Sequence, residues 1–120
     1  MTFEEFSKTE LRVAKVLAAE RVPASDKLVK LQISLGESER QLVAGIGKAY
    51  APEALVGREI VIVANLDPRK FTIKLPAEAG SEPQTLELES QGMLLAAHAE
   101  DGSPVLLMPD REAPPGSAIS

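Results

Sequence analysis

Hydrophobic and polar residues alternate along most of this chain with the period of two that is typical of β-strands. The clearest case is residues 29–35, where Val29, Leu31, Ile33 and Leu35 are separated by polar residues. Because successive side chains of a strand point to opposite faces, this segment predicts a strand with one buried face. The same reasoning predicts strands over residues 11–20, 40–46, 59–65, 71–75, 85–89, 92–99 and 104–109. The first of these is long enough to hold a β-bulge.

The start of the chain has the features of a short helix. Thr2 precedes Glu5 by the spacing of a capping box, so we expect a helix over residues 3–8. Phe3 and Phe6 would lie on the same side of that helix. We therefore predict that these two rings form its buried face.

A second short helix is predicted between the third and fourth strands. Pro52 suits the first helical position, and Gly57 lies just past the last one. Several strands of uneven length, with one helix among them and no regular alternation of strands and helices, favour an all-β fold. The best match is an OB-fold, a five-stranded Greek-key barrel, and a β-sandwich is the main alternative on pattern alone.

The length of 120 residues predicts one domain, residues 1–120, with a single hydrophobic core. Two predicted strands flank the acidic segment "PAEAGSEPQ", which indicates an extended β-hairpin inserted at about residues 71–89. Residues 104–120 form a C-terminal extension, and we expect its last part, "DREAPPGSAIS", to be ordered only in part.

The net charge of −5 is unevenly distributed. Residues 1–76 hold 12 Lys and Arg against 10 Asp and Glu, whereas residues 77–120 hold one base against eight acids. The chain has no cysteine and no apolar run approaching the ~20 residues that span a membrane. We therefore expect a cytoplasmic protein with no membrane partner, in which a mildly basic body is joined to an acidic C-terminal third.

Catalytic and metal-binding motifs are missing from the sequence. His98 is the single histidine, and no cysteine is available to complete a metal site with it. No serine lies in a G-x-S-x-G motif, and "GIGKAY" lacks the first glycine and the final Ser or Thr of a P-loop. We therefore expect no enzyme activity, metal or cofactor.

Aromatic residues are also scarce, with one Tyr, three Phe and no Trp. Binding of single-stranded nucleic acid usually relies on aromatic stacking platforms. Any nucleic-acid ligand of this chain would thus be held by phosphates, ribose hydroxyls and shape, which favours a folded RNA.

Three segments resemble a known family: "ELRVAKVLAAERVPASDKL", "RQLVAGIGKAYAPEALVGREIVIVANLDPRK" and "ESQGMLLAA". They are similar to the tRNA-binding domain appended to bacterial methionyl-tRNA synthetases. The same domain occurs in free-standing structure-specific tRNA-binding proteins and in eukaryotic synthetase-associated factors. The resemblance covers about residues 3–116. Secretion-chaperone relatives of the fold lack the GM-LAA segment and fit less well.

The resemblance implies an OB-fold that binds tRNA without reading its sequence, commonly as a homodimer. It also implies that two loops at one end of the barrel form the RNA-facing edge. The matching positions are Asn65, Arg69 and Lys70 in the NL-x-PRK motif, and Ser90, Gln91, Gly92 and Met93 in the S-x-G-M motif. Pro68 stiffens the first motif, which predicts a rigid corner with two adjacent cations for phosphates.

Other bases are weaker candidates for RNA contacts. They are Lys27, Arg12, Arg40 and Lys48. For each of them an exposed solubilising charge is an equal alternative, and Met93 fits the core better than an RNA contact.

The family resemblance predicts a non-catalytic tRNA-binding protein whose partners are tRNA, a second copy and an aminoacyl-tRNA synthetase. The alternative is a protein-interaction or chaperone-like barrel that has lost RNA binding.

The long hairpin departs from the family pattern, in which only a few residues separate the two motifs. Its tip and return strand carry Glu78, Glu82, Glu87 and Glu89 and no base. Carboxylates close to a phosphate path would weaken RNA binding. We therefore expect the hairpin to project away from the RNA and to contact a subunit or partner. Deleting residues 73–87 should leave tRNA affinity intact or improve it.

Overall fold

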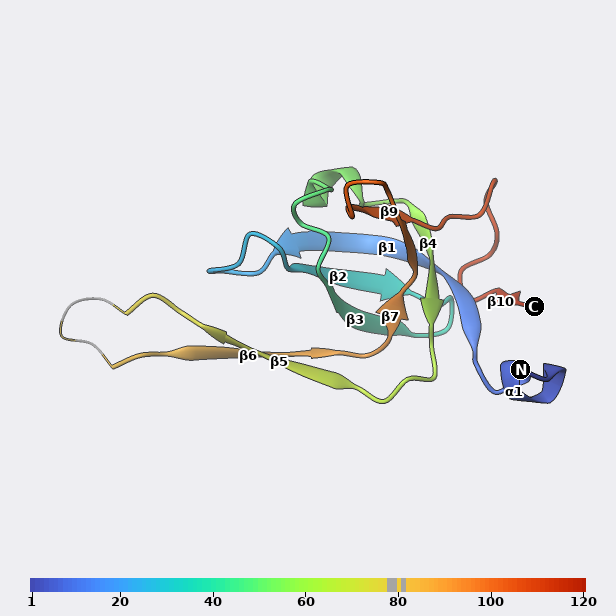
Figure 1. Cartoon of the computed structure of the whole chain (residues 1–120), viewed down its shortest axis with the longest axis horizontal. Coiled ribbons are helices and arrows are strands. Elements are labelled where there is room, and N and C mark those ends of the chain that lie inside the picture. Colours follow the sequence, from blue (N-terminus) through green and yellow to red (C-terminus); the bar gives the residue numbers. More distant parts are fainter. Residues whose placement is uncertain (78–79, 81) are drawn as a thin grey trace.

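A curled antiparallel sheet forms the body of the protein in a computed structural model that describes residues 1–77, 80 and 82–120 (Figure 1). The strand order in this sheet is β3-β2-β1-β4-β7. Its strands are β1 Leu11–Arg21, β2 Val29–Ser34, β3 Glu39–Ala44, β4 Glu59–Val63 and β7 Met93–Leu94. A short strand near the C-terminus, β10 Ala118–Ile119, pairs with the beginning of β1.

Two hairpins and two short helices complete the described fold. The hairpins are β5 Arg69–Lys74 with β6 Thr85–Ser90, and β8 Ala96–His98 with β9 Pro104–Leu106. The helices are α1 Phe3–Ser7 and the 3-10 helix η1 Pro52–Ala54. The predicted strand over residues 92–99 is therefore divided, because β7 pairs with β4 whereas β8 pairs with β9.

The inner face of the curled sheet forms the core. In β2 the predicted alternation is confirmed, with Val29, Leu31 and Ile33 buried. The predicted bulge in β1 is confirmed by a shift of register against β2 between Val16 and Ala18. Leu55, directly after η1, is also buried in this cluster. Burial of each such aliphatic side chain stabilises the fold by about 1.5–3 kcal/mol.

The two edges of the sheet meet, and this closes the barrel. The Gln91 amide, just before β7, donates a hydrogen bond of 2.8 Å to the Gln41 carbonyl of β3. The backbone of β3 also bonds the side chain of Ser90, at the end of β6. One sheet curled on itself, rather than two stacked sheets, confirms the predicted OB-like barrel.

Both ends of the chain differ in part from prediction. The cap on α1 is confirmed, since Thr2 Oγ1 accepts a hydrogen bond of 3.2 Å from the Glu5 amide. The predicted buried face of α1 is wrong, because Phe3 is 81% exposed and no residue of the helix is buried. The C-terminal segment was expected to be partly ordered, but it packs along β1, where the Val13 amide donates to the Ser117 carbonyl.

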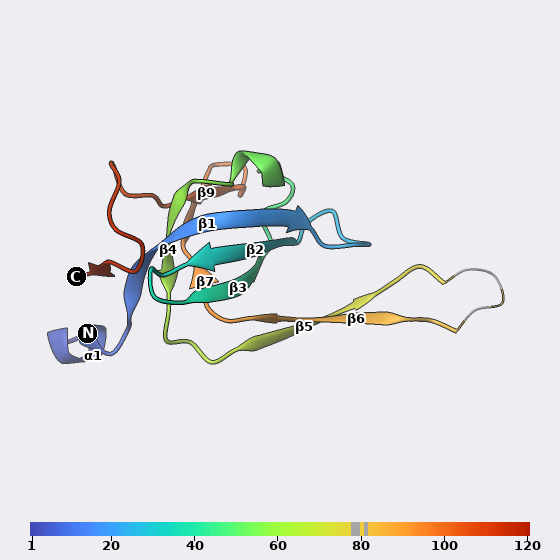
Figure 2. The same ribbon diagram turned by 180° about the vertical axis from the view of Figure 1, so that it is seen from behind.

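The β5–β6 hairpin extends from the barrel along the longest dimension of the molecule (Figures 1 and 2). The molecule measures 56 × 32 × 26 Å along its principal axes. The ladder begins at Arg69, two residues before the predicted insertion, and Glu78 in the tip lies outside the described residues. Within the described part of the chain, no helix is long and apolar enough to cross a membrane.

Candidate nucleic-acid interface

The two motifs are brought together by the base of the hairpin. In the β5–β6 ladder Arg69 is the partner of Ser90, and Lys70 is the partner of Glu89. The PRK segment thus lies beside the S-Q-G-M turn, as the family resemblance implied. Both cations are exposed, and neither forms an ion pair with any residue that the structure describes.

Arg69 and Lys70 do not stand side by side on a corner. They are the first two residues of a strand, so their side chains leave the ribbon on opposite faces. Residues opposite each other in the ladder share a face, which places Glu89 on the face of Lys70 and leaves Ser90 on the face of Arg69. The two cations therefore have different electrostatic surroundings.

Ser90 and Gln91 use their polar groups inside the protein. The Ser90 hydroxyl is buried, accepts a hydrogen bond of 2.9 Å from the Val43 amide and donates one of 3.0 Å to the Gly92 carbonyl. The side-chain oxygen of Gln91 accepts a hydrogen bond of 3.1 Å from the Gln41 amide. These contacts replace a regular ladder between β3 and the strand that follows the hairpin.

Asn65 also forms internal contacts. Its Oδ1 accepts a hydrogen bond of 2.9 Å from the Glu10 amide, and its Nδ2 donates one of 2.6 Å to the Lys8 carbonyl. The Asn65 amide thus joins the end of β4 to the segment between α1 and β1.

Arg40 connects the same region to the S-Q-G-M turn. Its Nη1 donates to the carbonyls of Ala64 and Gln91. This guanidinium fixes the end of β4 relative to the turn.

Gly92 and Met93 have different environments. Gly92 has a φ of +145°, and a Cβ there would lie 3.1 Å from the Val63 carbonyl oxygen and 3.2 Å from Leu42 Cδ2. Glycine is therefore required for close packing against β4 and β3. Met93 is 50% exposed, so its expected place in the core is wrong.

Lys27 and Lys48 lie around the same hollow, beside the β8–β9 turn. Both line a hollow of 390 Å³ with Gly45, Ala49 and residues 101–104 of the β8–β9 turn. Lys48 Nζ is 3.7 Å from the Asp26 carboxylate, and both side chains are so exposed that this pair contributes little to stability. In the same turn, hydrogen bonds from the hydroxyl and amide of Ser103 lower the pKa of Asp101. Arg12 donates to the Gly116 carbonyl at 3.0 Å and is thus engaged with the C-terminal segment.

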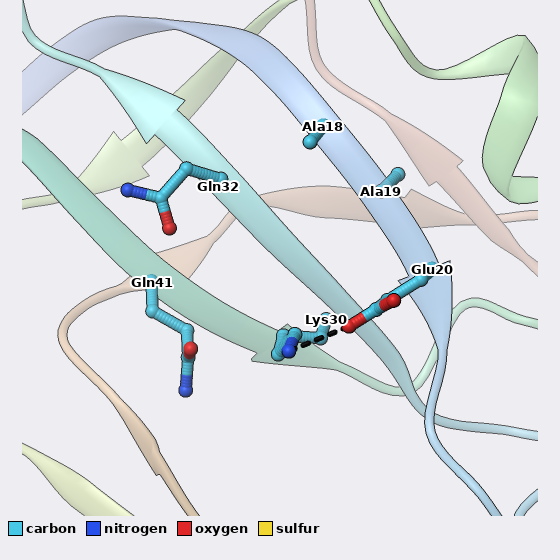
Figure 3. Close-up of a pocket in the computed structure, with 6 residues that line it drawn as sticks. All are labelled: Ala18, Ala19, Glu20, Lys30, Gln32 and Gln41. Atoms are coloured by element: carbon cyan, nitrogen blue, oxygen red, sulfur yellow. Dashed lines mark ion pairs between the residues drawn. The ribbon is translucent and has the colours of Figure 1, made fainter.

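A further hollow on the outer face of β1, β2 and β3 was not predicted (Figure 3). Its volume is 270 Å³, and it is lined by Ala18, Ala19, Glu20, Lys30, Gln32 and Gln41. Lys30 pairs with Glu20 at 2.6 Å, and Gln41 Nε2 donates to the Glu89 carbonyl at 3.0 Å. The outward-facing polar residues of β2 were visible in the alternation, but nothing in the pattern indicated that they would line a hollow with Ala18 and Ala19.

Comparison with known proteins identifies a family for this fold and site. Residues 11–118 match the family described as "Putative tRNA binding domain". Methionine–tRNA ligases of Caldanaerobacter subterraneus subsp. tengcongensis and Thermotoga maritima are each 48% identical over 120 residues. This chain aligns over its full length but spans only 16% and 17% of those two relatives.

Two crystal structures of similar length have the same fold. A MetRS-related protein from Pyrococcus horikoshii is 35% identical with a TM-score of 0.81, and the match covers 100% of this chain and 97% of that one. The chaperone CsaA from Bacillus anthracis is 33% identical with a TM-score of 0.80, covering 100% and 98%. The chain thus belongs to the tRNA-binding domain family that is also found in methionine–tRNA ligases.

Proposed function

We propose that this domain binds folded tRNA without catalysis and that Arg69 and Lys70 make its main phosphate contacts. The observation that carries the proposal is the pair of exposed cations at the base of the hairpin, beside the turn that closes the barrel. Their position on opposite faces lets them reach two different phosphates. Arg offers a planar fork for phosphate oxygens, whereas Lys offers a compact charge.

The other motif residues hold this base in place. Ser90, Gln91, Asn65 and Arg40 direct their polar groups to backbone atoms of the barrel and of the segment before β1. We assign them a positioning role, because a fixed base lowers the entropy that the two cations lose when RNA binds.

A larger footprint would include the outer face of β2 and β3. OB-fold proteins bind oligonucleotides on this face and on the adjoining loops. The hollow of Figure 3 adjoins the S-Q-G-M turn through Gln41, and Lys27 and Lys48 lie around a second hollow. Exposed Met93 would add an apolar contact next to the turn.

The test is a titration with total tRNA at two salt concentrations. We compare the parent protein with Arg69→Ala/Lys70→Ala and with a control of equal charge, Lys74→Ala/Arg111→Ala. On a plot of the logarithm of the binding constant against the logarithm of the salt concentration, each phosphate contact contributes a slope of roughly −0.9. Loss of two contacts should therefore weaken binding and reduce the slope by nearly two, and the control should keep the parent slope. Equal losses in both variants, or no binding by the parent at low salt, would refute the proposal.

We further propose that two copies associate. Apolar side chains are exposed on α1 and on or beside β7 and β9: Phe3, Met93, Val105, Leu107 and Met108. A dimer would cover such side chains and join two small cationic edges into one larger binding surface. Sedimentation equilibrium should give about twice the chain mass of 12.8 kDa, and a mass of one chain at micromolar concentration would exclude the dimer.

The domain can act as part of a methionyl-tRNA synthetase or in trans beside one, in the cytoplasm where tRNA is used. The similarity to methionine–tRNA ligases supports this setting. The similarity to the CsaA chaperone, together with the exposed apolar residues, favours a protein-binding barrel as the second candidate. Binding to a protein partner through apolar contacts would persist at high salt, whereas tRNA binding would not.

A further inference from the structure

We propose that Phe71 positions Arg69 for RNA binding by holding its guanidinium stacked on the aromatic ring. This inference rests on the proposed function. The carbon Cζ of Arg69 lies 4.7 Å from the centre of the Phe71 ring, within the range of a cation–π interaction. The two residues are two positions apart in β5, so their side chains leave the strand on the same face.

The ring of Phe71 has its own support in the hairpin. Phe71 is half-buried, and its partner across the ladder is Leu88. The next ladder pair on the same face is Ile73 with Leu86. The apolar neighbours of Phe71 on this face of the ladder are thus aliphatic, and the aromatic ring occupies the position next to Arg69.

Stacking fixes the arginine without consuming its donors. When a guanidinium stacks on a ring, the ring contacts its flat face and the N–H groups point outward in the plane of the group. In that arrangement all five N–H donors of Arg69 stay available to phosphate oxygens. A free arginine would lose more side-chain entropy on binding than one already held in place.

The same face also lacks opposing charge. The residues of β6 that share the face of Arg69 are Leu86, Leu88 and Ser90, whereas Glu87 and Glu89 lie on the face of Lys70. Arg69 is therefore both held in place and free of a neighbouring carboxylate within this ladder. We expect Arg69→Ala to weaken tRNA binding more than Lys70→Ala.

A double-mutant cycle on tRNA affinity tests the inference. The variants are Arg69→Ala, Phe71→Leu and their combination, with Phe71→Tyr as the variant that keeps the ring. A solvent-exposed cation–π contact corresponds to about 2- to 5-fold in affinity. Phe71→Leu should cause a loss of that size with the salt slope unchanged, because no charge is removed. Phe71→Tyr should keep the parent affinity. In the Arg69→Ala background, adding Phe71→Leu should cause no further loss of affinity.

If Arg69→Ala weakens binding and lowers the salt slope, two results would overturn the inference about Phe71 and leave the proposed function standing. The first is parent-like affinity in Phe71→Leu, which would make the stack irrelevant to binding. The second is an equal loss from Phe71→Leu with and without Arg69, which would assign Phe71 a direct contact or a purely structural role. If Arg69→Ala itself leaves affinity and slope unchanged, the proposed function of the hairpin base fails together with the inference.

Discussion

Replacement of Ser90 by alanine removes a buried hydroxyl that joins two edges of the barrel. The strand β3 lies at the edge of the sheet, so its outward-facing amides have no ladder partner there. The Ser90 hydroxyl supplies a partner to the Val43 amide at 2.9 Å and itself donates to the Gly92 carbonyl at 3.0 Å. In Ser90→Ala both backbone groups lose this partner.

The size of the effect follows from burial. Ser90 is 3% exposed and Val43 is 7% exposed, so water has little access to the vacated position. A buried donor left without a partner costs about 1–3 kcal/mol, and the small volume change from Ser to Ala adds little. We therefore expect Ser90→Ala to lower the free energy of unfolding by about 2 kcal/mol.

Urea unfolding followed by far-ultraviolet circular dichroism measures this change, since the chain has no tryptophan. With an m-value of about 2 kcal/mol/M, the midpoint should fall by roughly 1 M with the m-value unchanged. Ser38→Ala, at an exposed serine between β2 and β3, is the matched control and should stay within about 0.5 kcal/mol of the parent.

The positioning role of Ser90 also makes a prediction about binding. Under conditions where Ser90→Ala is folded, its tRNA affinity should equal that of the parent protein. Parent-like stability with a strong loss of affinity would contradict the reasoning and identify Ser90 as a direct RNA contact.

The remaining predictions concern the glycine of the S-Q-G-M turn and the hairpin. Gly92→Ala should lower the free energy of unfolding in urea by about 1–3 kcal/mol, because a side chain is strained at a φ of +145° and would press on Val63. A parent-like midpoint would show that the turn relaxes. Replacing residues 74–85 by Asn-Gly joins the ladder partners Ile73 and Leu86 through a two-residue turn. In a titration at physiological salt, the tRNA affinity of this shortened variant should stay within about twofold of the parent value. A tenfold loss of affinity would identify the hairpin as an RNA contact.

Local patterns predicted most of the fold. The alternation in β2 identified its buried face because the period of side chains along a strand is a local property. Pro52 and Gly57 likewise located the short helix η1. Phe3 was misassigned to a buried face because its spacing from Phe6 describes a helix surface but does not show whether anything packs against it.

The sequence predicted where the candidate site lies, but not the directions in which the side chains of Arg69 and Lys70 point. Pro68 suggested a turn, so Arg69 and Lys70 were expected to stand together on a corner. Their actual orientation depends on pairing with Ser90 and Glu89, which lie some twenty residues further along the chain. The internal hydrogen bonds of Ser90 likewise depend on β3, a strand that the sequence near the motif does not reveal.

An acidic chain can bind a polyanion at this place because its charges are separated in space. At the base of the hairpin Glu89 shares the face of Lys70 but not that of Arg69, whereas Glu82 lies near the tip. Arg69 and Ala77 are eight residue steps apart, which in an extended chain span roughly 26 Å at ~3.3 Å per step. This is about three times the Debye length of ~8 Å at physiological salt, so the tip hardly reduces the attraction of the base for phosphate. Near 0.01 M salt the Debye length grows to ~30 Å, and the shortened hairpin should then bind tRNA more tightly than the parent protein.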